Sequence, residues 1–160
     1  MKRVFHELEP IYDKNSEILI LGSFPSVKSR ENHFYYGHPQ NRFWRIFEHL
    51  FDVKFIDIES KKKFLYEHRI ALWDVIESCE IEGSSDASIT NVKINDIKKI
   101  IDESQIKKIY VNGKKAEELY NKYVFKQVNI SCIVLPSTSP ANAAYTFDKL
   151  IKKWEVITNK

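Results

Sequence analysis

The sequence predicts an α/β fold, a three-layer α/β/α sandwich with a central four-stranded parallel sheet, within a single domain of 160 residues. Four short apolar segments, rich in β-branched residues and largely without alternation, have the pattern of strands that are buried on both faces. These segments cover residues 18–21, 70–75, 109–111 and 130–135. Helical patterns lie between them, and strands that alternate with helices favour parallel pairing through right-handed crossovers.

Each helix is expected from an apolar stripe at helical spacing. The first begins near Asn41, a favoured N-cap, and a short second helix precedes the second strand. A third helix follows Asp96, a fourth follows Gly113, and the last follows Pro140. In chain order the stripes are Phe43, Phe47, Leu50 and Phe51; Phe64 and Leu65; Ile97, Ile100 and Ile101; Ala116, Leu119, Tyr120 and Tyr123; and Ala144, Phe147, Leu150, Ile151 and Trp154.

Residues 82–95, EGSSDASITNVKIN, form the one long polar stretch of the sequence. Its length suits a functional loop, and its composition is unlike that of a linker between domains. We therefore expect a loop here, within the single domain.

Composition places the chain among globular proteins, with 43% hydrophobic and 29% charged residues. No apolar run approaches the roughly 20 residues that span a bilayer. The start, MKRVFHELEP, has no apolar core, so neither a membrane partner nor a signal peptide is expected. Cys79 and Cys132 are too isolated to suggest a disulfide framework, which favours the cytoplasm. The net charge of +3 permits a nucleic-acid partner without requiring one, and we expect a monomer.

Two loops of unusual composition follow the first and the fourth strand. They read GSFPSVKSRENHFYYGHPQN and PSTSPANAAY, rich in serine, proline, asparagine and aromatic residues. Because the carboxyl ends of parallel strands share one edge of a sheet, where ligands bind, these loops predict the site. The turn after the third strand, Asn112-Gly113-Lys114, lacks a full phosphate-loop pattern and is expected to be a tight turn.

The loops resemble the active-site motifs of the uracil-DNA glycosylase superfamily. GSFPS (22–26) is similar to the first motif, GHPQNRFW (37–44) resembles a segment of the mismatch-specific uracil and thymine glycosylases, and LPSTSPANA (135–143) is similar to the second motif. Together with ALWDVIESCEIEGSSDASI, they most resemble the hypoxanthine-DNA (deoxyinosine) glycosylase branch. The match runs in order along nearly the whole chain, whereas GSFPS by itself would be a weak signal.

One departure bears on the chemistry that the resemblance implies. The superfamily usually has a water-activating Asp or Asn where this chain has Phe24, and a His or Asn where it has Ser137. A phenyl ring can neither orient nor deprotonate water. The hypoxanthine branch also lacks the water-activating Asp or Asn at the position of Phe24, and its key polar residue corresponds to Asn41. The resemblance therefore implies poor excision of uracil.

The resemblance also implies which residues bind the base and which carry out the reaction. The base-binding residues are Gly22, Ser23, Phe24, Pro25 and Tyr36, and the catalytic residues are Asn41 and, as a secondary candidate, His38. Tyr36 would stack on the flipped base, whereas Phe34 and Tyr35 fit ordinary buried loop aromatics better. The residues alone leave Asn41 open between a helix cap and a catalytic group, and His38 between a general acid and a structural hydrogen-bonding group.

DNA contacts are expected from the loop after the fourth strand and from three cations. The residues are Ser137, Thr138, Ser139, Pro140, Ala141 and Asn142, with Lys28, Arg30 and Arg42. Hydroxyls and backbone amides in such a loop bind phosphate oxygens, although the same residues would equally cap the last helix. Ala141 is small for a side chain that fills the gap left by a flipped nucleotide, so Asn142 is the stronger candidate. Each cation could instead be a plain surface charge.

Together these residues predict a monofunctional DNA glycosylase that hydrolyses the N-glycosidic bond of deoxyinosine during base excision repair. Its partner would be DNA that contains deaminated bases. Neither motif holds a lysine that could form a Schiff base, no cofactor is expected, and no residue cluster suggests a metal. Three alternatives stay open: a broader mismatch-specific uracil/thymine glycosylase, a non-catalytic module that binds damaged DNA, and a hydrolase of small nucleotides.

Overall fold

The centre of the protein is the four-stranded parallel sheet that the sequence predicts, in a computed structural model that describes residues 3–158. The strands are β2 (Ile18–Gly22), β3 (Ile70–Asp74), β6 (Lys108–Asn112) and β7 (Cys132–Leu135), in the order β3-β2-β6-β7. Each neighbouring pair is parallel, so the four carboxyl ends lie at one edge of the sheet.

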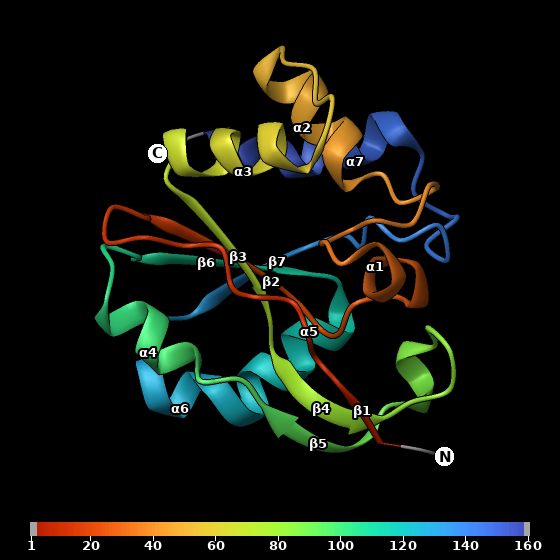
Figure 1. Ribbon diagram of the computed structural model, residues 1–160, viewed down its shortest axis with the longest axis vertical. Helices are drawn as coiled ribbons and strands as arrows, with labels where there is room; N and C mark the ends of the chain where they lie inside the picture. Colours follow the sequence, from red (N-terminus) through yellow and green to blue (C-terminus); the bar gives the residue numbers. More distant parts are fainter. Residues whose placement is uncertain (1–2, 159–160) are drawn as a thin grey trace.

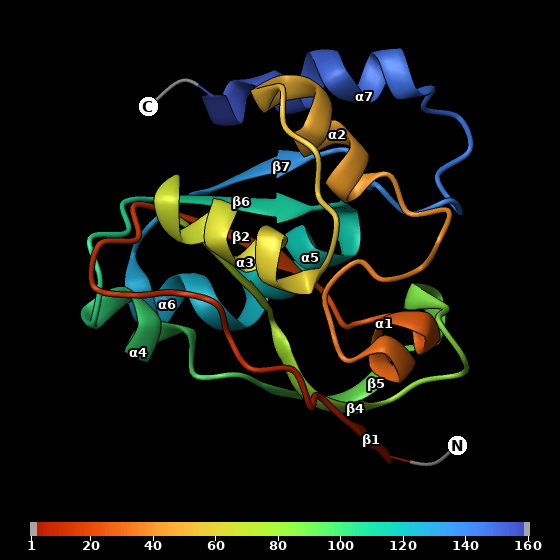
Figure 2. The same cartoon turned by 45° about the horizontal axis from the view of Figure 1, so that its top comes forward.

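The helices cover both faces of this sheet, as Figure 1 and Figure 2 show. One layer contains α2 (Phe43–Phe51), α3 (Ile58–Glu67) and α7 (Phe147–Trp154), which runs into the short turn η3 (Glu155–Thr158). The opposite layer contains α4 (Ile97–Asp102), α5 (Lys114–Leu119) and α6 (Phe125–Val128), with the π-helical turn η2 (Tyr120–Val124) between the last two. The short helix α1 (Val27–Asn32) follows β2. No helix within the described residues is both long enough and apolar enough to cross a membrane.

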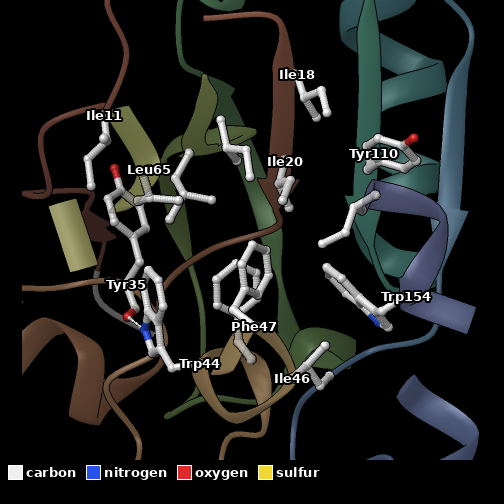
Figure 3. Close-up of a cluster of buried hydrophobic side chains, with 14 of the residues drawn as sticks. Ile11, Ile18, Ile20, Tyr35, Trp44, Ile46, Phe47, Leu65, Tyr110 and Trp154 are labelled. Atoms are coloured by element: carbon white, nitrogen blue, oxygen red, sulfur yellow. Dashed lines mark hydrogen bonds between the residues drawn. The ribbon is translucent and has the colours of Figure 1, made fainter. Parts of the chain in front are cut away.

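β2 is buried along its whole length because helices lie on both sides of it. Ile18 and Ile20 face one core, and Leu19 and Leu21 face the other. Figure 3 shows the first of these cores, between the sheet and the layer of α2, α3 and α7. An apolar side chain is therefore needed at every position of this strand, which explains why its sequence shows no alternation.

The aromatic residues around the start of α2 belong mainly to that first core. Phe34 and Tyr35 are buried, as expected, and the Tyr35 carbonyl accepts a hydrogen bond from Trp44 Nε1 at 2.9 Å (Figure 3). Phe43 lies edge-on to Trp154 of α7, with ring centroids 5.7 Å apart. Burial of each such ring contributes about 2–3 kcal/mol. These contacts fix both ends of the loop at residues 33–42.

A second, antiparallel sheet extends from the end of β3. It contains β1 (Arg3–Phe5), β4 (Ile76–Glu80) and β5 (Thr90–Ile94), in the order β1-β4-β5. The expectation of one loop over residues 82–95 is therefore wrong for its second half. In β5 the partly buried Val92 and Ile94 alternate with exposed polar residues, which is the pattern of a strand with one solvated face. The loop that remains contains the short turn η1 (Asp86–Ser88).

Candidate active site

A pocket opens at the carboxyl ends of the parallel strands, where the sequence predicts a site. Its volume is about 110 Å³, below the roughly 300–1,000 Å³ of pockets for drug-sized ligands, so it suits a single small ring system. Its lining residues are Gly22, Ser23, Phe24, Pro25, Ser26, Ser29, Tyr35, Tyr36, Asn41, Asp74, Ser84, Asp86, Asn112, Ser137, Thr138 and Ser139. The structure thus brings together all five predicted base-binding residues, Asn41, and the first half of the loop after β7.

Gly22 and Asp74, which both line the pocket, approach each other closely. The two residues are in register on neighbouring strands β2 and β3. A Cβ atom on Gly22 would lie 2.4 Å from Asp74 Oδ1 and 3.1 Å from the Tyr36 hydroxyl. Only glycine therefore leaves room for the carboxylate. The other oxygen of this buried carboxylate, Oδ2, lies 2.8 Å from His6 Nε2.

Serine side chains hold the loop at residues 33–42 against α1. Ser26 Oγ accepts the Ser29 N–H at 3.1 Å and caps the helix, and Ser29 Oγ in turn accepts the Gly37 N–H at 2.9 Å. His33 ends α1 with a left-handed backbone (φ 56°). The chain therefore turns back over α1, and Tyr36 reaches the pocket wall.

Tyr36 lines the pocket, but one face of its ring is already covered. The ring stacks on Phe43, with centroids 3.9 Å apart and planes inclined by 14°, so the opposite face alone is left for a base. Its hydroxyl is buried, and the Asn112 side chain lies close to it. Burial, together with the nearby Asp74 carboxylate, raises the pKa of Tyr36, so the hydroxyl keeps its proton.

Asn41 stabilises α2 with one end of its side chain and leaves the other end free. Its Oδ1 accepts the N–H of Phe43, the first residue of the helix, at 2.9 Å, although the N-cap position itself is Arg42. Its Nδ2 group makes no hydrogen bond within residues 3–158, and the residue lines the pocket. Asn41 can therefore cap the helix and still present a hydrogen-bond donor to a ligand.

Arg42 holds the loop after β7. Its guanidinium donates to the carbonyl oxygens of Ser139 and Asn142, at 2.9 and 3.1 Å, and also to that of Tyr145. Its backbone N–H donates to the Thr138 carbonyl at 3.1 Å. These bonds use most of the directional donors of Arg42 inside the protein. A phosphate contact from this residue stays a prediction.

Thr138 is fully buried and connects the same loop to β6. Asn112 Oδ1 accepts the Thr138 N–H, and Asn112 Nδ2 donates to Thr138 Oγ1, each at 3.1 Å. The Thr138 hydroxyl thus has an internal partner. Ser137 and Ser139 line the pocket beside it, and Ser137 Oγ accepts the Ser139 N–H at 3.2 Å.

The remaining predicted DNA contacts lie outside the pocket lining. Pro140 and Ala141 are exposed, and Asn142 Nδ2 donates to the Ser137 carbonyl at 3.0 Å. Lys28 is exposed on α1, 3.8 Å from Glu31. These positions are open to a large ligand, and their contacts with DNA stay predictions.

The structure does not bring His38 into the pocket. Its Nδ1 accepts the N–H of Gln40 at 3.0 Å, on the far side of Pro39, which is a structural hydrogen bond within a turn. His38 is not among the residues that line the pocket, and a catalytic role for it stays a prediction.

A second carboxylate reaches the pocket from the loop that contains η1. Asp86 Oδ1 accepts a hydrogen bond from Ser23 Oγ at 3.0 Å. Arg30 anchors the loop, since it donates to the Gly83 carbonyl at 3.3 Å and its guanidinium lies 5.3 Å from the centre of the Phe24 ring. Desolvation raises the pKa of the Asp86 carboxyl, although the hydrogen bond from Ser23 opposes the rise.

The residues that the sequence did not identify include Asp74, Asp86 and Asn112, which line the pocket, and His6, which contacts Asp74. Asp74 and Asn112 are the last residues of β3 and β6, so their position at the carboxyl end of a buried strand could have identified them. Asp86 belongs to the polar stretch at residues 82–95, but nothing local marks it within that stretch. His6 gives no local signal at all, because only the pairing of β1 with β4 brings it to the site.

The fold and the pocket define a class of protein. A parallel sheet carries a small pocket at its carboxyl edge, between a loop after the first strand and a loop after the last strand. Within residues 3–158 no group of three His, Cys, Asp or Glu side chains could hold a metal ion. The chain belongs to the uracil DNA glycosylase superfamily, whose family model matches residues 9–158.

Similar proteins place the chain more narrowly within the superfamily. It is 37% identical over 152 residues to the hypoxanthine DNA glycosylase of Methanosarcina acetivorans, covering 92% of this chain and 93% of that protein. The hypoxanthine DNA glycosylase of Methanosarcina barkeri is 35% identical over 136 residues, covering 83% and 85%. A solution NMR structure of a candidate uracil DNA glycosylase from Methanosarcina acetivorans superposes with a TM-score of 0.81 at 36% identity, covering 94% of each chain. The resemblance and the predicted three-layer fold are thus confirmed.

Proposed function

We propose that this protein is a monofunctional DNA glycosylase that removes hypoxanthine from deoxyinosine in DNA, as part of base excision repair. One observation carries the proposal: a pocket of single-base size combines the free amide donor of Asn41 with the Phe24 ring. The two relatives named hypoxanthine DNA glycosylases match over most of the chain and support the same conclusion. Action as a monomer stays a prediction.

The substrate nucleotide enters the pocket after it has been flipped out of the duplex. Extrusion costs a few kcal/mol, and stacking on an aromatic face offsets about 1–3 kcal/mol of this. The face of Tyr36 opposite Phe43 is the surface that supplies the stacking. Backbone groups of the turn at residues 22–25 meet the edge of the base, and the loop that Arg42 holds lies against the flanking phosphates.

Hydrolysis forms a bond from a water oxygen to C1′ while the C1′–N9 bond breaks. The bonding electrons leave with the base, which takes up a proton, and the proton lost by the water goes to solvent. An asparagine has no useful pKa and cannot take that proton. Because the free end of Asn41 is a donor, it fits an acceptor atom of the departing base, where negative charge accumulates in the transition state. A base that fills the pocket displaces water from it, and the lower local dielectric strengthens this interaction.

A lyase reaction would require an amine that attacks C1′. No lysine is among the residues that line the pocket in the described part of the chain. The enzyme is therefore expected to leave an intact strand with an abasic site.

The test is the release of free base from duplex oligonucleotides that carry inosine, uracil or xanthine, with an undamaged duplex as the control. We expect hypoxanthine release and an abasic strand that breaks only after alkali. Tight binding to the inosine duplex without release would point to a binding module. Release from free deoxyinosine, with little dependence on salt, would instead indicate a hydrolase of small nucleotides, which neutralises no run of phosphates.

A further inference from the structure

The buried pair of Asp74 and His6 has no part in the mechanism above. The His6 side chain is 1% exposed and that of Asp74 is 4% exposed, and their contacting atoms are 2.8 Å apart. An ionised carboxylate carries no proton, so the His6 Nε2–H is the donor and Asp74 Oδ2 the acceptor. The imidazole lies against Phe24 and Tyr35, with ring centroids 6.1 Å away in both cases, so it has little freedom to move.

This arrangement leaves one carboxylate oxygen of Asp74 for the pocket. Asp74 is a lining residue, and within residues 3–158 its Oδ1 atom has no hydrogen-bond partner. Oδ1 and the Tyr36 hydroxyl both lie close to Gly22, since a Cβ atom there would be 2.4 Å from the first and 3.1 Å from the second. A ligand that fills the pocket would cover this oxygen, and a covered acceptor without a partner is costly, so the position favours a ligand with a donor there.

We propose that Asp74, held in place by His6, determines specificity by accepting the N1–H of the lactam edge of hypoxanthine. The inference rests on the proposed function, because it assumes that a nucleobase fills the pocket. Hypoxanthine has an N1–H donor next to the O6 acceptor, whereas adenine has an unprotonated N1 acceptor at the same place. A carboxylate oxygen bonds the first and repels the second. His6 is a positioning residue, since it touches Asp74 and not the base.

The contact defines a class of bases. Hypoxanthine, xanthine and guanine share the N1–H and O6 pair, so Asp74 excludes adenine without separating these three from one another. Guanine in a normal pair is excluded at an earlier step, because its stronger pairing opposes flipping.

The decisive substrate is a duplex that contains purine 2′-deoxyriboside, which lacks O6 and has an acceptor at N1. It is no larger than deoxyinosine and pairs weakly, so neither size nor flipping excludes it. Asp74→Asn keeps the shape of the side chain. In this variant the amide oxygen accepts from His6, and the NH₂ group faces the pocket. We expect the preference for inosine over purine to fall by about tenfold to a hundredfold.

The preference is measured in two ways, so that this inference and the proposed function can fail separately. Single-turnover base release gives one ratio. Equilibrium binding to duplexes with the two bases on a non-cleavable 2′-fluoroarabino sugar gives the other. If the wild type binds the inosine duplex but releases no base, the proposed function fails, and the binding ratio still decides the role of Asp74. An unchanged binding ratio in Asp74→Asn overturns the inference.

Two further variants test His6, and one serves as a control. His6→Ala should lower the same ratio, and His6→Gln, which can donate to Asp74 Oδ2, should restore part of it. A purely structural role would lower thermal stability in both variants without changing the ratio, which would overturn the assignment of His6. Asp102→Asn makes the same chemical change on α4, in the opposite layer, and should leave the ratio as in the wild type. Asp74→Ala, which removes the acceptor without adding a donor, replaces Asp74→Asn if that variant does not fold.

Discussion

The Asn41 side chain can cap a helix and also offer a hydrogen-bond donor to a ligand, two roles that the sequence alone presents as alternatives. Asparagine is favoured before a helix because its oxygen satisfies a free N–H, and the Phe43 N–H receives that bond. The amide also carries a donor group at its other end, which makes no hydrogen bond within residues 3–158, and the residue lines the pocket. The residue pattern alone could not decide between a cap and a catalytic group, because the geometry allows both at once.

We expect Asn41→Ala to have a small effect on stability, from the lost cap, and a large effect on excision, from the lost donor. The lost cap should lower the free energy of unfolding by about 0.5–2 kcal/mol. The lost donor should lower single-turnover excision of hypoxanthine by about 10²–10³-fold. Asp96→Ala is the matched control, since Asp96 caps α4 in the opposite layer by accepting the Lys99 N–H. It should cost similar stability with unchanged excision. If Asn41→Ala excises within a few-fold of the wild type, Asn41 is only a cap.

Asp86 makes stability depend on pH, because folding raises its pKa through desolvation. A carboxyl group of this kind favours folding below its unfolded pKa, and this contribution is lost as the pH rises through the folded pKa. Asp86→Asn keeps an acceptor for Ser23 Oγ but cannot ionise. We therefore expect the variant to melt at a higher temperature than the wild type at neutral pH, with a difference that shrinks as the pH falls.

The measurement is thermal unfolding by circular dichroism between about pH 3 and pH 8. Asp102→Asn is again the control. It removes an exposed partner of Lys98, so it should lower the melting temperature slightly at neutral pH. A lower melting temperature for Asp86→Asn at neutral pH would show that the ionised carboxylate is stabilising.

At the scale of elements, the loop after β7 depends on α2. Arg42 lies at the start of this helix, and its guanidinium donates to the carbonyl oxygens of Ser139, Asn142 and Tyr145 in the loop. Lysine keeps the charge but loses the planar fork of donors. We expect Arg42→Lys to weaken binding of the inosine duplex by about tenfold, since the loop loses its shape. Arg45→Lys is the control, because Arg45 is exposed and donates to the Gln40 carbonyl at 3.3 Å. Nearly unchanged affinity in Arg42→Lys would mean that Arg42 acts as a charge alone.

How well each strand could be predicted depended on whether it is buried on both faces or on one. Strands buried on both faces, such as β2, need an apolar residue at every position, and the sequence shows this directly. β5 buries one face only, and two half-buried apolar residues mark it, so it looked like part of a polar loop. The site was predictable where it follows such strands, at Gly22 and Ser137. It was not predictable at His6, which reaches Asp74 only through pairing between distant strands.

At the scale of the molecule, Phe24 lines the pocket and also packs against residues that connect it to the antiparallel sheet and to the η1 loop. The ring of Phe24 lies edge-on to His6, which follows β1, and under the guanidinium of Arg30, which anchors the loop at residues 82–89. The position that usually holds a water-activating group in the superfamily is thus a packing position here. A change at this residue affects the antiparallel sheet, the η1 loop and the Asp74 pair together.

Base selectivity follows from this arrangement. Without a carboxylate or carboxamide at position 24, a base that is a poor leaving group should react slowly. A backbone N–H of the turn at residues 22–25 aimed at the six position would bond the carbonyl of hypoxanthine and be left unpaired against adenine. An unpaired buried donor costs about 1–3 kcal/mol, a factor of roughly ten to a hundred. We therefore expect inosine to be excised, adenine to be untouched, and uracil to react slowly or not at all.

Phe24→Asn tests whether the missing amide alone limits uracil excision. We expect it to raise uracil release, but to lower inosine release and to cost about 2 kcal/mol of stability, because the ring no longer packs on His6 and Arg30. Phe24→Leu, which loses the ring without gaining an amide, separates the two effects and should not raise uracil release. The measurement is single-turnover release of each base from matched duplexes, with thermal unfolding recorded for each variant. Robust uracil excision by the wild type, with inosine ignored, would contradict the assignment to the hypoxanthine branch while leaving the superfamily intact.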